Sequence, residues 1–302
     1  MLMNKIQYGM KEGQKSVARD EESKKRNMSR QNLLNDCPVI KVEGETLPKA
    51  WEKSVMKCWQ EGIAIKTEYD KAGDPPSRDC TMIMEVTHPF KEPRLHRAFP
   101  AGLEDLEIYR QEVIYGVHDD WIKPSQGKWE YTYHERLFNY KVEGRSIDQI
   151  DYVVRKLSET PYTRRAQAVT WKAWLDPECN DPPCMQRLWL RIFEDHLQLN
   201  VYFRSNDAFK AAFMNMFAFT ELQKVIAEKI SEKIGKKIKV GKYVHVADSY
   251  HIYGSYYKDF KGFLDTLKKR SFEERTWSTS FAEPFFEEGR KRLKRDKKGN
   301  PV

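Results

Sequence analysis

Residues 188–207 read LWLRIFEDHLQLNVYFRSND, and the fold class follows most directly from this stretch. Its two apolar runs, 188–193 and 197–203, flank a short polar turn at 194–196, which is the pattern of a β-hairpin. Residues 208–234 then carry apolar side chains at helical spacing, so a long helix is predicted there. A hairpin followed by a long helix favours an α+β domain.

Further predicted elements lie on both sides of this hairpin. Helical periodicity and helix-stop residues predict helices at 47–61, 103–115, 146–157 and 260–267, whereas strand-like runs lie at 81–86, 168–175 and 241–253. The Gly- and Pro-containing residues 63–77 predict a loop. We therefore expect one α+β domain over residues 37–289, preceded by a polar charged arm (1–36) and followed by a basic tail (290–302).

The positive charge is concentrated at the two ends of the chain. The 302 residues carry 53 Lys and Arg against 45 Asp and Glu, a net charge of +8. Residues 1–30 contribute +4 and residues 290–302 contribute +6, so residues 31–289 carry −2. Because the body of the chain is nearly neutral, the total charge does not indicate a nucleic-acid-binding domain.

The composition disfavours several classes of protein. No apolar run approaches the roughly 18 residues of a membrane helix, and the first residues lack the apolar centre of a signal peptide, so we expect a cytoplasmic protein with no membrane partner. The five cysteines are odd in number, widely spaced and contain no CxxC pair, which favours free thiols. The seven histidines do not cluster, so no metal site is predicted.

Four short segments in the second half carry the most reactive side chains. They are TRRAQ at 163–167, DPPCM at 181–185, FRSND at 203–207 and YHIY at 250–253. Converging guanidinium groups suit a phosphate because each donates paired hydrogen bonds. A thiol near such cations ionises more readily and becomes a better nucleophile. An asparagine amide, such as that of Asn215, can both donate and accept along the edge of a pyrimidine.

The order and spacing of these segments resemble the thymidylate synthase family. Gln149 lies fifteen residues before Arg164, and Arg164 lies twenty residues before Cys184. Arg204 follows Cys184 by a further twenty residues, and Asn215 follows Arg204 by eleven. Any one of these motifs alone would be a weak signal, but four in order at the family's spacing are specific.

The resemblance covers residues 133–257 well and residues 46–121 loosely. It implies a mixed, mostly antiparallel sheet covered by helices, with sheets packed across a homodimer. It also implies an enzyme that transfers a one-carbon unit to C5 of dUMP and reduces it to methyl. The unit would come from 5,10-methylenetetrahydrofolate or a related tetrahydropterin such as methylenetetrahydromethanopterin, without a metal.

The resemblance assigns five residues to the nucleotide phosphate. Arg204 and Ser205 would hold it, and Arg78 on the early loop would do the same. Arg164 and Arg165 would reach it from the other subunit, which would make the homodimer obligatory. Taken alone, this arginine pair is more typical of an ordinary solvated pair after a helix.

The resemblance also assigns residues to the base, the sugar and the pterin. Asn215 would read the base, His251 with Tyr253 would bind the sugar hydroxyl, and Asp207 and Trp121 would contact the pterin side. A structural interpretation competes at each position. Asn215 could be a satisfied polar group in a helix, and His251 and Tyr253 could be half-buried packing on a strand. Asp207 could be a helix cap, and Trp121 could be a core tryptophan.

Four residues form the catalytic group that the resemblance implies. Cys184 would add to C6 of the pyrimidine, Arg204 would support it, and Tyr133 would lie in the active site. The general acid/base glutamate is expected on the helix at 103–115. We assign it to Glu112, with Glu107 as the alternative because gaps leave the alignment uncertain at this point.

Several departures mark a divergent member. Met185, Phe203, Ala211 and the pair Ser255-Tyr256 stand where the family usually has histidine, glutamine, glycine and Asn-His. The apolar C-terminal peptide that closes over the pterin is not evident. These changes leave open a hydroxymethylase acting on dUMP or on dCMP/CMP, in which water takes the place of hydride, although an asparagine at the base favours uracil.

A third hypothesis belongs to another class, a non-catalytic nucleic-acid-binding protein that uses its basic ends. Such binding would be unspecific and sensitive to salt. The ends lack the interleaved aromatic residues of a base-stacking surface, and Cys184 is intact. We therefore expect no specific nucleic-acid partner.

Overall fold

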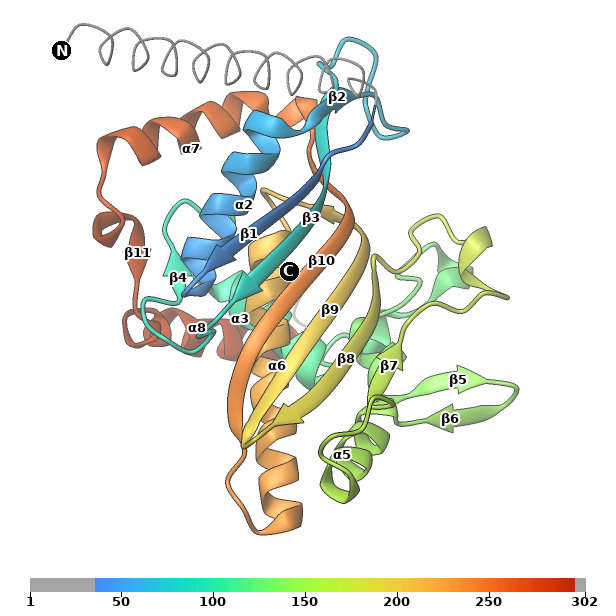
Figure 1. Ribbon diagram of the computed structural model, residues 1–302. Helices are drawn as coiled ribbons and strands as arrows, with labels where there is room; N and C mark the ends of the chain where they lie inside the picture. The colour runs from blue at the N-terminus through green and yellow to red at the C-terminus, as the bar shows by residue number, and fades with distance from the viewer. Residues whose placement is uncertain (1–35, 297–302) are drawn as a thin grey trace, which may run out of the picture. The chain divides into compact units, whose positions relative to one another are not determined.

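A seven-stranded sheet organises residues 36–296, the part of the chain that the computed structural model describes (Figure 1). The strand order is β1 (Val39–Gly44), β3 (Ser77–Val86), β10 (Lys239–Ile252), β9 (His196–Asp207), β8 (Met185–Phe193) and β7 (Gln167–Val169), and β2 (Ile63–Ile65) pairs with β3. The β1–β3 and β9–β10 pairs are parallel and the other four are antiparallel. The predicted fold class, α+β with a mixed and mostly antiparallel sheet, is therefore confirmed.

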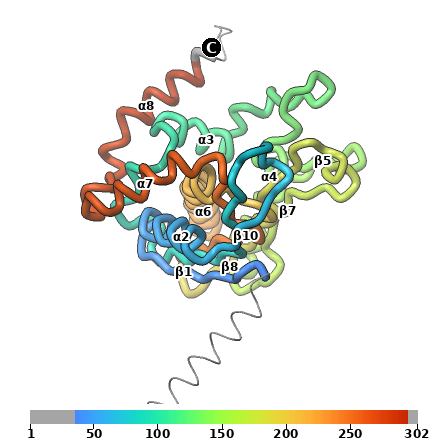
Figure 2. The backbone as a smooth tube through the Cα atoms, turned by 90° about the horizontal axis from the view of Figure 1, so that it is seen from above, coloured from blue at the N-terminus to red at the C-terminus, as the bar shows by residue number. Residues whose placement is uncertain are grey.

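Helices cover one face of this sheet. They are α2 (Leu47–Glu61), α3 (Leu103–Tyr115), α4 (Tyr133–Phe138), α5 (Gln149–Glu159), α6 (Ala212–Ile234), α7 (Tyr257–Lys269) and α8 (Thr279–Asp296). Figure 2 shows α6 at the centre with α2, α3 and α7 around it. Helix α2 packs on β1, β3 and β10, and α6 packs on β9 and β10. Two small ribbons complete the fold: β4 (Leu95–His96) with β11 (Thr276–Trp277), and β5 (Tyr140–Val142) with β6 (Arg145–Ile147).

The core lies between the sheet and α6. Alternate residues of β9 are buried, including Leu199, Val201 and Phe203, as expected for a strand with one face on a core. Helix α6 buries a wide apolar face that includes Phe213 and Phe217. This packing fixes the end of β9 beside the start of α6, where the chemically interesting residues lie.

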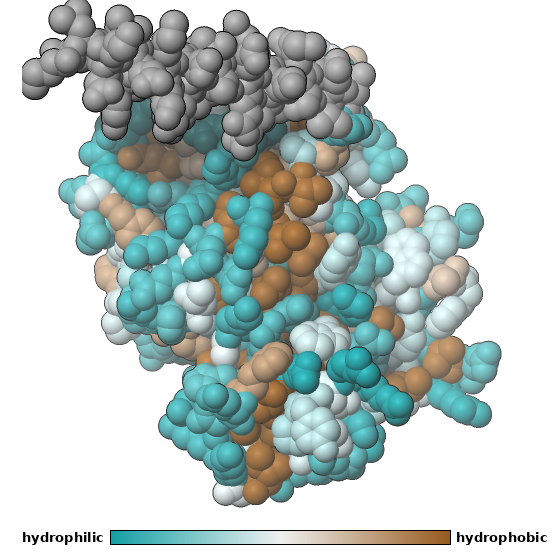
Figure 3. Space-filling view, viewed as in Figure 1, coloured by the Kyte–Doolittle hydropathy of each residue, from teal (hydrophilic) through white to brown (hydrophobic). Residues whose placement is uncertain are grey.

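The other face of the sheet carries an apolar strip among polar residues and is left without a covering helix by residues 36–296 (Figures 1 and 3). Ile83, Val244 and Val246 alternate with buried core residues and are only half-buried. Figure 3 shows apolar side chains gathered along this side of the molecule. An apolar strip on an uncovered sheet face is typical of packing against another layer.

Several predicted elements are confirmed. Helices α2 and α3 have the predicted bounds, since Pro48 begins the first and the left-handed Gly116 (φ 63°) ends the second. The predicted helix at 260–267 lies inside α7, and the predicted strands at 81–86 and 241–253 lie in β3 and β10.

Two predicted segments end early or start late for local reasons. The helix expected at 146–157 begins only at Gln149, because residues 145–147 pair with β5 and the Asp148 carboxylate accepts from the backbone N of Asp151 (2.8 Å). The strand expected at 168–175 ends at Val169. The chain turns there because the buried Arg136 side chain donates to the Thr170 carbonyl (3.0 Å).

The expected boundaries of other segments also shift. Helix α6 begins at Ala212 and not at residue 208, because the Asp207 carboxylate accepts from the backbone N of residues 209 and 210 and holds a turn. The loop expected at 63–77 contains β2 and the first residue of β3. Helix α8 runs across residue 290, where a basic tail was expected to begin; the predicted arm at 1–36 lies outside the described residues except for Asp36.

Candidate active site

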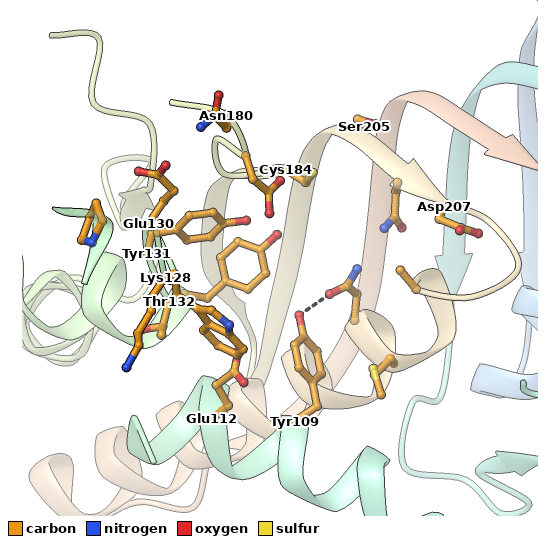
Figure 4. A pocket seen from close by; sticks show the side chains of 18 of the residues that line it. Tyr109, Glu112, Lys128, Glu130, Tyr131, Thr132, Asn180, Cys184, Ser205 and Asp207 are labelled. Atoms are coloured by element: carbon orange, nitrogen blue, oxygen red, sulfur yellow. Dashed lines mark hydrogen bonds between the residues drawn. The ribbon is translucent and has the colours of Figure 1, made fainter. Parts of the chain in front are cut away.

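A cavity of about 690 Å³ lies where β9, β10, α3 and α6 meet the segment before α4 (Figure 4). Eight of the predicted site residues line it: Glu112, Tyr133, Cys184, Ser205, Asp207, Asn215, His251 and Tyr253. In Figure 4, Cys184, Ser205 and Asp207 come from the sheet side, and Tyr109 and Glu112 come from α3 below. Segments far apart in the sequence therefore converge on one hollow.

The Cys184 thiol is half-buried in the cavity wall, directly before β8. Burial raises the pKa of this thiol, whereas the nearby Arg204 guanidinium lowers it and Asp181 raises it further. The Arg204 Nη2 lies 3.8 Å from the Cys184 Sγ. This cation provides the local stabilisation of a thiolate that a buried sulfur needs to react.

Arg204 is held over the Pro-Pro-Cys turn, beside the cavity lining. Its Nε and Nη2 donate to the carbonyls of Pro183 (3.0 Å) and Pro182 (2.7 Å), and its backbone N donates to the Cys184 carbonyl (2.9 Å). These bonds use part of the donor set of the guanidinium and fix its plane. The β8–β9 pairing thus brings Arg204 and Cys184 together although they are twenty residues apart.

Two glutamates on α3 have opposite surroundings. Glu112 lines the cavity, and its Oε2 lies 3.0 Å from the His118 Nδ1. Glu107 is fully buried and accepts hydrogen bonds from Arg110 and Arg290, so it is part of the α3–α8 contact. Of the two candidates for an acid/base, only Glu112 faces the cavity within the described residues.

Tyr133 connects the cavity to the backbone next to Cys184. Its hydroxyl accepts from the backbone N of Met185 at 3.1 Å. Burial raises the pKa of Tyr133 well above its usual value, so the phenol stays protonated. Its single proton is thus still available to a group in the cavity.

His251 presents an unsatisfied nitrogen at the cavity. Its Nδ1 lies 3.1 Å from the Ser249 hydroxyl, while its buried Nε2 has no hydrogen-bond partner among the described residues. A buried polar nitrogen without a partner is uncommon and is typical of a ligand site. The Tyr253 ring packs edge-on against the imidazole, with ring centroids 4.5 Å apart.

Asp207 both caps a turn and lines the cavity. Burial raises the pKa of its carboxyl, and the backbone N–H groups of residues 209 and 210 together with His251 partly oppose that rise. The structural and functional interpretations of this residue are therefore compatible.

Five of the predicted residues do not line the cavity: Arg204, which lies beside it, and Arg78, Trp121, Arg164 and Arg165. The Arg78 guanidinium donates to the Gly62 carbonyl (3.1 Å) and lies 5.8 Å from the Trp59 ring. Arg164 and Arg165 are exposed. Their carbonyls accept from Trp189 (3.1 Å) and Tyr152 (3.4 Å), and the Arg165 backbone N donates to the Thr163 hydroxyl (3.1 Å). Trp121 stacks on His118 at 3.9 Å, one layer behind Glu112.

The cavity also contains residues that sequence reasoning missed. They are Tyr109, Lys128, Trp129, Glu130, Tyr131, Asn180, Asp181 and Asn206. Two signals were present: Tyr131 precedes Tyr133 in YTY, and Asn206 lies inside the RSND motif. Trp129, and not Trp121, is the tryptophan on the cavity wall, and no spacing argument pointed to it.

Comparison with known proteins agrees with this geometry. A family profile described as "Thymidylate synthase" matches residues 100–283. The "Putative thymidylate synthase" of Methanocaldococcus jannaschii is 30% identical over 220 residues, covering 71% of this chain and 91% of that protein. The chain belongs to the thymidylate synthase family. A protein of the same description from Methanosarcina mazei is 30% identical over 207 residues, covering 68% of this chain and 89% of its own length.

The fold of the thymidylate synthase family is also found by structural comparison. The thermostable thymidylate synthase A of Bacillus subtilis superposes with a TM-score of 0.56 at 19% identity, over 73% of this chain and 84% of that one. Within residues 36–296, no helix is long and apolar enough to cross a bilayer. The same residues contain no group of three or more His, Cys, Asp or Glu side chains arranged to hold a metal ion.

Proposed function

We propose that this thymidylate synthase family member transfers a one-carbon unit from a folate-type methylene-tetrahydropterin to C5 of dUMP and reduces it to methyl. The observation that carries the proposal is the Cys184 thiol, which shares one cavity with Ser205, Asn215 and His251 and has Arg204 at 3.8 Å. A nucleophile next to a cation and opposite an acidic group is the arrangement that addition to a pyrimidine requires.

Cys184 starts and ends the reaction. Its thiolate forms a bond to C6, the C5=C6 electron pair moves toward the C4 carbonyl oxygen, and C5 becomes the nucleophile that takes the one-carbon unit. Removal of the C5 proton would break the bond between the one-carbon unit and the pterin nitrogen and leave an exocyclic methylene. Hydride supplied by the pterin would then add to that carbon as Cys184 leaves C6 as a thiolate and the C5=C6 double bond is restored. Burial raises the pKa of the Cys184 thiol, so the Arg204 charge is needed to favour the thiolate when a nucleotide is bound.

Glu112 is the acid/base of this proposal. Its carboxylate is 3.0 Å from His118, an arrangement that holds the carboxylate in place at the cavity wall. From that wall it can exchange protons with the C4 oxygen of the base, directly or through one water. Tyr133, which is bonded to the Met185 backbone N, supports the turn that carries Cys184.

Phosphate binding is assigned to Arg204 and Ser205, with Arg78 on β3 nearby. Arg164 and Arg165 are exposed in the single chain and are proposed to complete the phosphate site of a partner subunit. The apolar strip on the uncovered sheet face supports a homodimer, because such a patch is typical of an interface. Sugar binding is assigned to Tyr253 and to His251, whose Nε2 needs a partner.

The pterin side of the cavity is assigned to Asp207 and the tryptophan-bearing segment. A cavity of about 690 Å³ exceeds what a nucleotide base needs, and Asp207 and Trp129 supply a carboxylate and an aromatic face. Trp121 lies one layer behind and acts by supporting His118. When bound, the reduced pterin would supply the one-carbon unit and the hydride; the chain's own residues bind it and exclude water.

A hydroxymethylase is the second candidate, and the charged residues of one part of the cavity wall support it. Lys128, Glu130 and Asp181 line this region, and charged groups of this kind retain water. Water in place of hydride would give a hydroxymethyl product from the same Cys184 adduct. A non-catalytic protein that binds nucleic acid through its basic ends would form neither the methyl nor the hydroxymethyl product.

The experiment is tritium release from dUMP labelled at C5, with the product identified by mass. We expect release and a methyl product; a hydroxymethyl product supports the second candidate, and no release with uracil or cytosine nucleotides refutes both. Cys184→Ser should stop turnover and keep nucleotide binding. Cys179→Ser is the matched control, five residues away and outside the cavity lining, and should remain active.

A further inference from the structure

A single hydrogen bond links two helices at the floor of the cavity. The hydroxyl of Tyr109, on α3, donates to the Asn215 Oδ1, on α6, at 2.5 Å (Figure 4, dashed line). Both side chains line the cavity. The backbone of Asn215 is fixed by the α6 ladder, since its N donates to the Ala211 carbonyl (3.0 Å).

The Tyr109 proton sets the direction of the Asn215 amide. Burial raises the pKa of Tyr109 well above its usual value, so this phenol remains a donor at every working pH. With the amide reversed, the Asn215 NH₂ group would donate to the phenol oxygen and the phenol proton would need another acceptor. Among the described residues, Tyr109 makes no second hydrogen bond. A reversed amide would leave the phenol proton without an acceptor on the protein and lose the free energy of that hydrogen bond, so the observed direction is favoured.

The fixed amide presents a defined pattern to a ligand. The Asn215 Oδ1 has a second lone pair and can accept one more proton, while its Nδ2 group can only donate. Uracil offers the matching pair, an N3–H donor beside a C4 carbonyl acceptor. Cytosine offers the reverse, an N3 acceptor beside a C4 amino donor, and would need the amide to turn against Tyr109.

We infer that Tyr109 is a positioning residue that sets base specificity, because it holds the Asn215 amide in the direction that accepts uracil and opposes cytosine. This inference rests on the proposed binding of a pyrimidine nucleotide in the cavity and goes beyond it by naming the device that selects the base. A site built to pair with specific donors and acceptors discriminates strongly against the analogue that lacks them.

The test measures dissociation constants of dUMP and dCMP in the absence of pterin, so it does not depend on turnover. Wild-type protein should prefer dUMP. Tyr109→Phe should lower the dUMP/dCMP preference by about tenfold or more, which corresponds to the loss of one hydrogen bond that holds the amide. Tyr115→Phe is the matched control: it removes the same oxygen from the same helix at a side chain that is 58% exposed, and the preference should not change.

A ligand series on the wild-type protein covers the case in which Tyr109→Phe does not fold. The 2-pyrimidinone nucleotide, which has only hydrogen at C4, should have an affinity between those of dUMP and dCMP. It lacks the C4 carbonyl acceptor of uracil, but it also lacks the cytosine amino donor that would face the donor Nδ2 of Asn215. Equal binding of dUMP and dCMP by the wild type overturns the inference. So does a folded Tyr109→Phe protein that keeps the full preference. Intact selectivity without tritium release would refute the proposed reaction and leave the base assignment standing.

Discussion

The buried His245 should make the stability of the protein fall steeply below pH 6.5. This residue is 0% exposed on β10 and stacks on Phe203 with ring centroids 4.5 Å apart. Its Nδ1 accepts from the Tyr243 hydroxyl (2.9 Å), and its Nε2–H donates to the Asn206 Oδ1 (3.0 Å) when the ring is neutral. Burial lowers the pKa of His245 to about 3. The folded protein therefore holds this imidazole neutral.

The size of the effect follows from the two pKa values. In the unfolded chain His245 titrates near 6.5, so below that pH the unfolded state binds a proton that the folded state does not. The free energy of unfolding then decreases by about 1.4 kcal/mol for each pH unit from 6.5 down toward 3. Between pH 7.5 and pH 5.5, His245 alone accounts for a loss of about 1.4 kcal/mol.

The assay is urea unfolding of the wild type and of His245→Gln at pH 7.5 and pH 5.5. Glutamine does not titrate and keeps a polar group near Tyr243 and Asn206. The variant should be less stable at pH 7.5, because it loses ring packing, yet its drop on acidification should be smaller than the wild-type drop by about 1.4 kcal/mol. Other titrating groups contribute equally to both proteins. Equal drops would refute the assignment of a neutral, low-pKa histidine to this position.

Three further outcomes test the site. Glu112→Gln should abolish turnover with little loss of stability. Glu107→Gln should lower the free energy of unfolding by about 1–3 kcal/mol, because the fully buried side chain at 107 loses the charge that pairs with Arg110 and Arg290. Thermal melts and tritium release separate the two variants, and the reverse pattern would contradict our assignment. We expect Arg164→Ala and Cys184→Ser to be inactive alone and to regain about a quarter of the wild-type activity when equal amounts of their subunits are mixed. Half of the dimers are then mixed dimers, and each of these has one complete site. No recovery would argue against a shared site. Iodoacetamide should modify Cys184 slowly at pH 7 and faster as the pH rises past 9, because burial raises the pKa of this thiol. Peptide mass spectrometry measures the modification rate, and a rate that reaches its plateau below pH 8 would contradict this expectation.

The parts of the fold that the sequence predicted well are those with local signals. Helices α2 and α3 were predicted residue for residue, because proline or glycine marks their ends and periodic apolar positions fill their interiors. The β8–β9 hairpin was predicted for the same reason, since a short polar turn separates two apolar runs. Each of these signals lies within a few residues of the structure that it produces.

The parts that the sequence predicted poorly depend on side chains distant along the chain. The strand after Gln167 ends at Val169 because Arg136, more than thirty residues earlier, donates to the Thr170 carbonyl and pairs with Asp176. Apolar composition alone suggested that the strand would continue. No periodicity can reveal that an arginine on another element ends it.

The candidate site divides in the same way. The motif spacing identified Cys184 and Asn215, and their presence in one cavity agrees with that expectation. Tyr109 was missed because its importance lies in the partner that it meets, 106 residues later. Trp129 was missed because it lies in no motif; its place on the cavity wall, with its ring edge-on to Trp121 (centroids 5.1 Å apart), is set by the fold.

The two asparagines of the cavity follow one principle. The Oδ1 of Asn206 accepts from His245, and the Oδ1 of Asn215 accepts from Tyr109, so both amides have their oxygen held by protein and their nitrogen left for a ligand. Neither holder changes protonation near neutral pH, because burial lowers the pKa of His245 to about 3 and raises that of Tyr109 well above 10. The donor pattern of the cavity is thus fixed before a nucleotide binds, so these groups need not reorient during the reaction. It follows that a change of nucleotide affinity between pH 6 and pH 8 does not come from these amides or from the two groups that hold them.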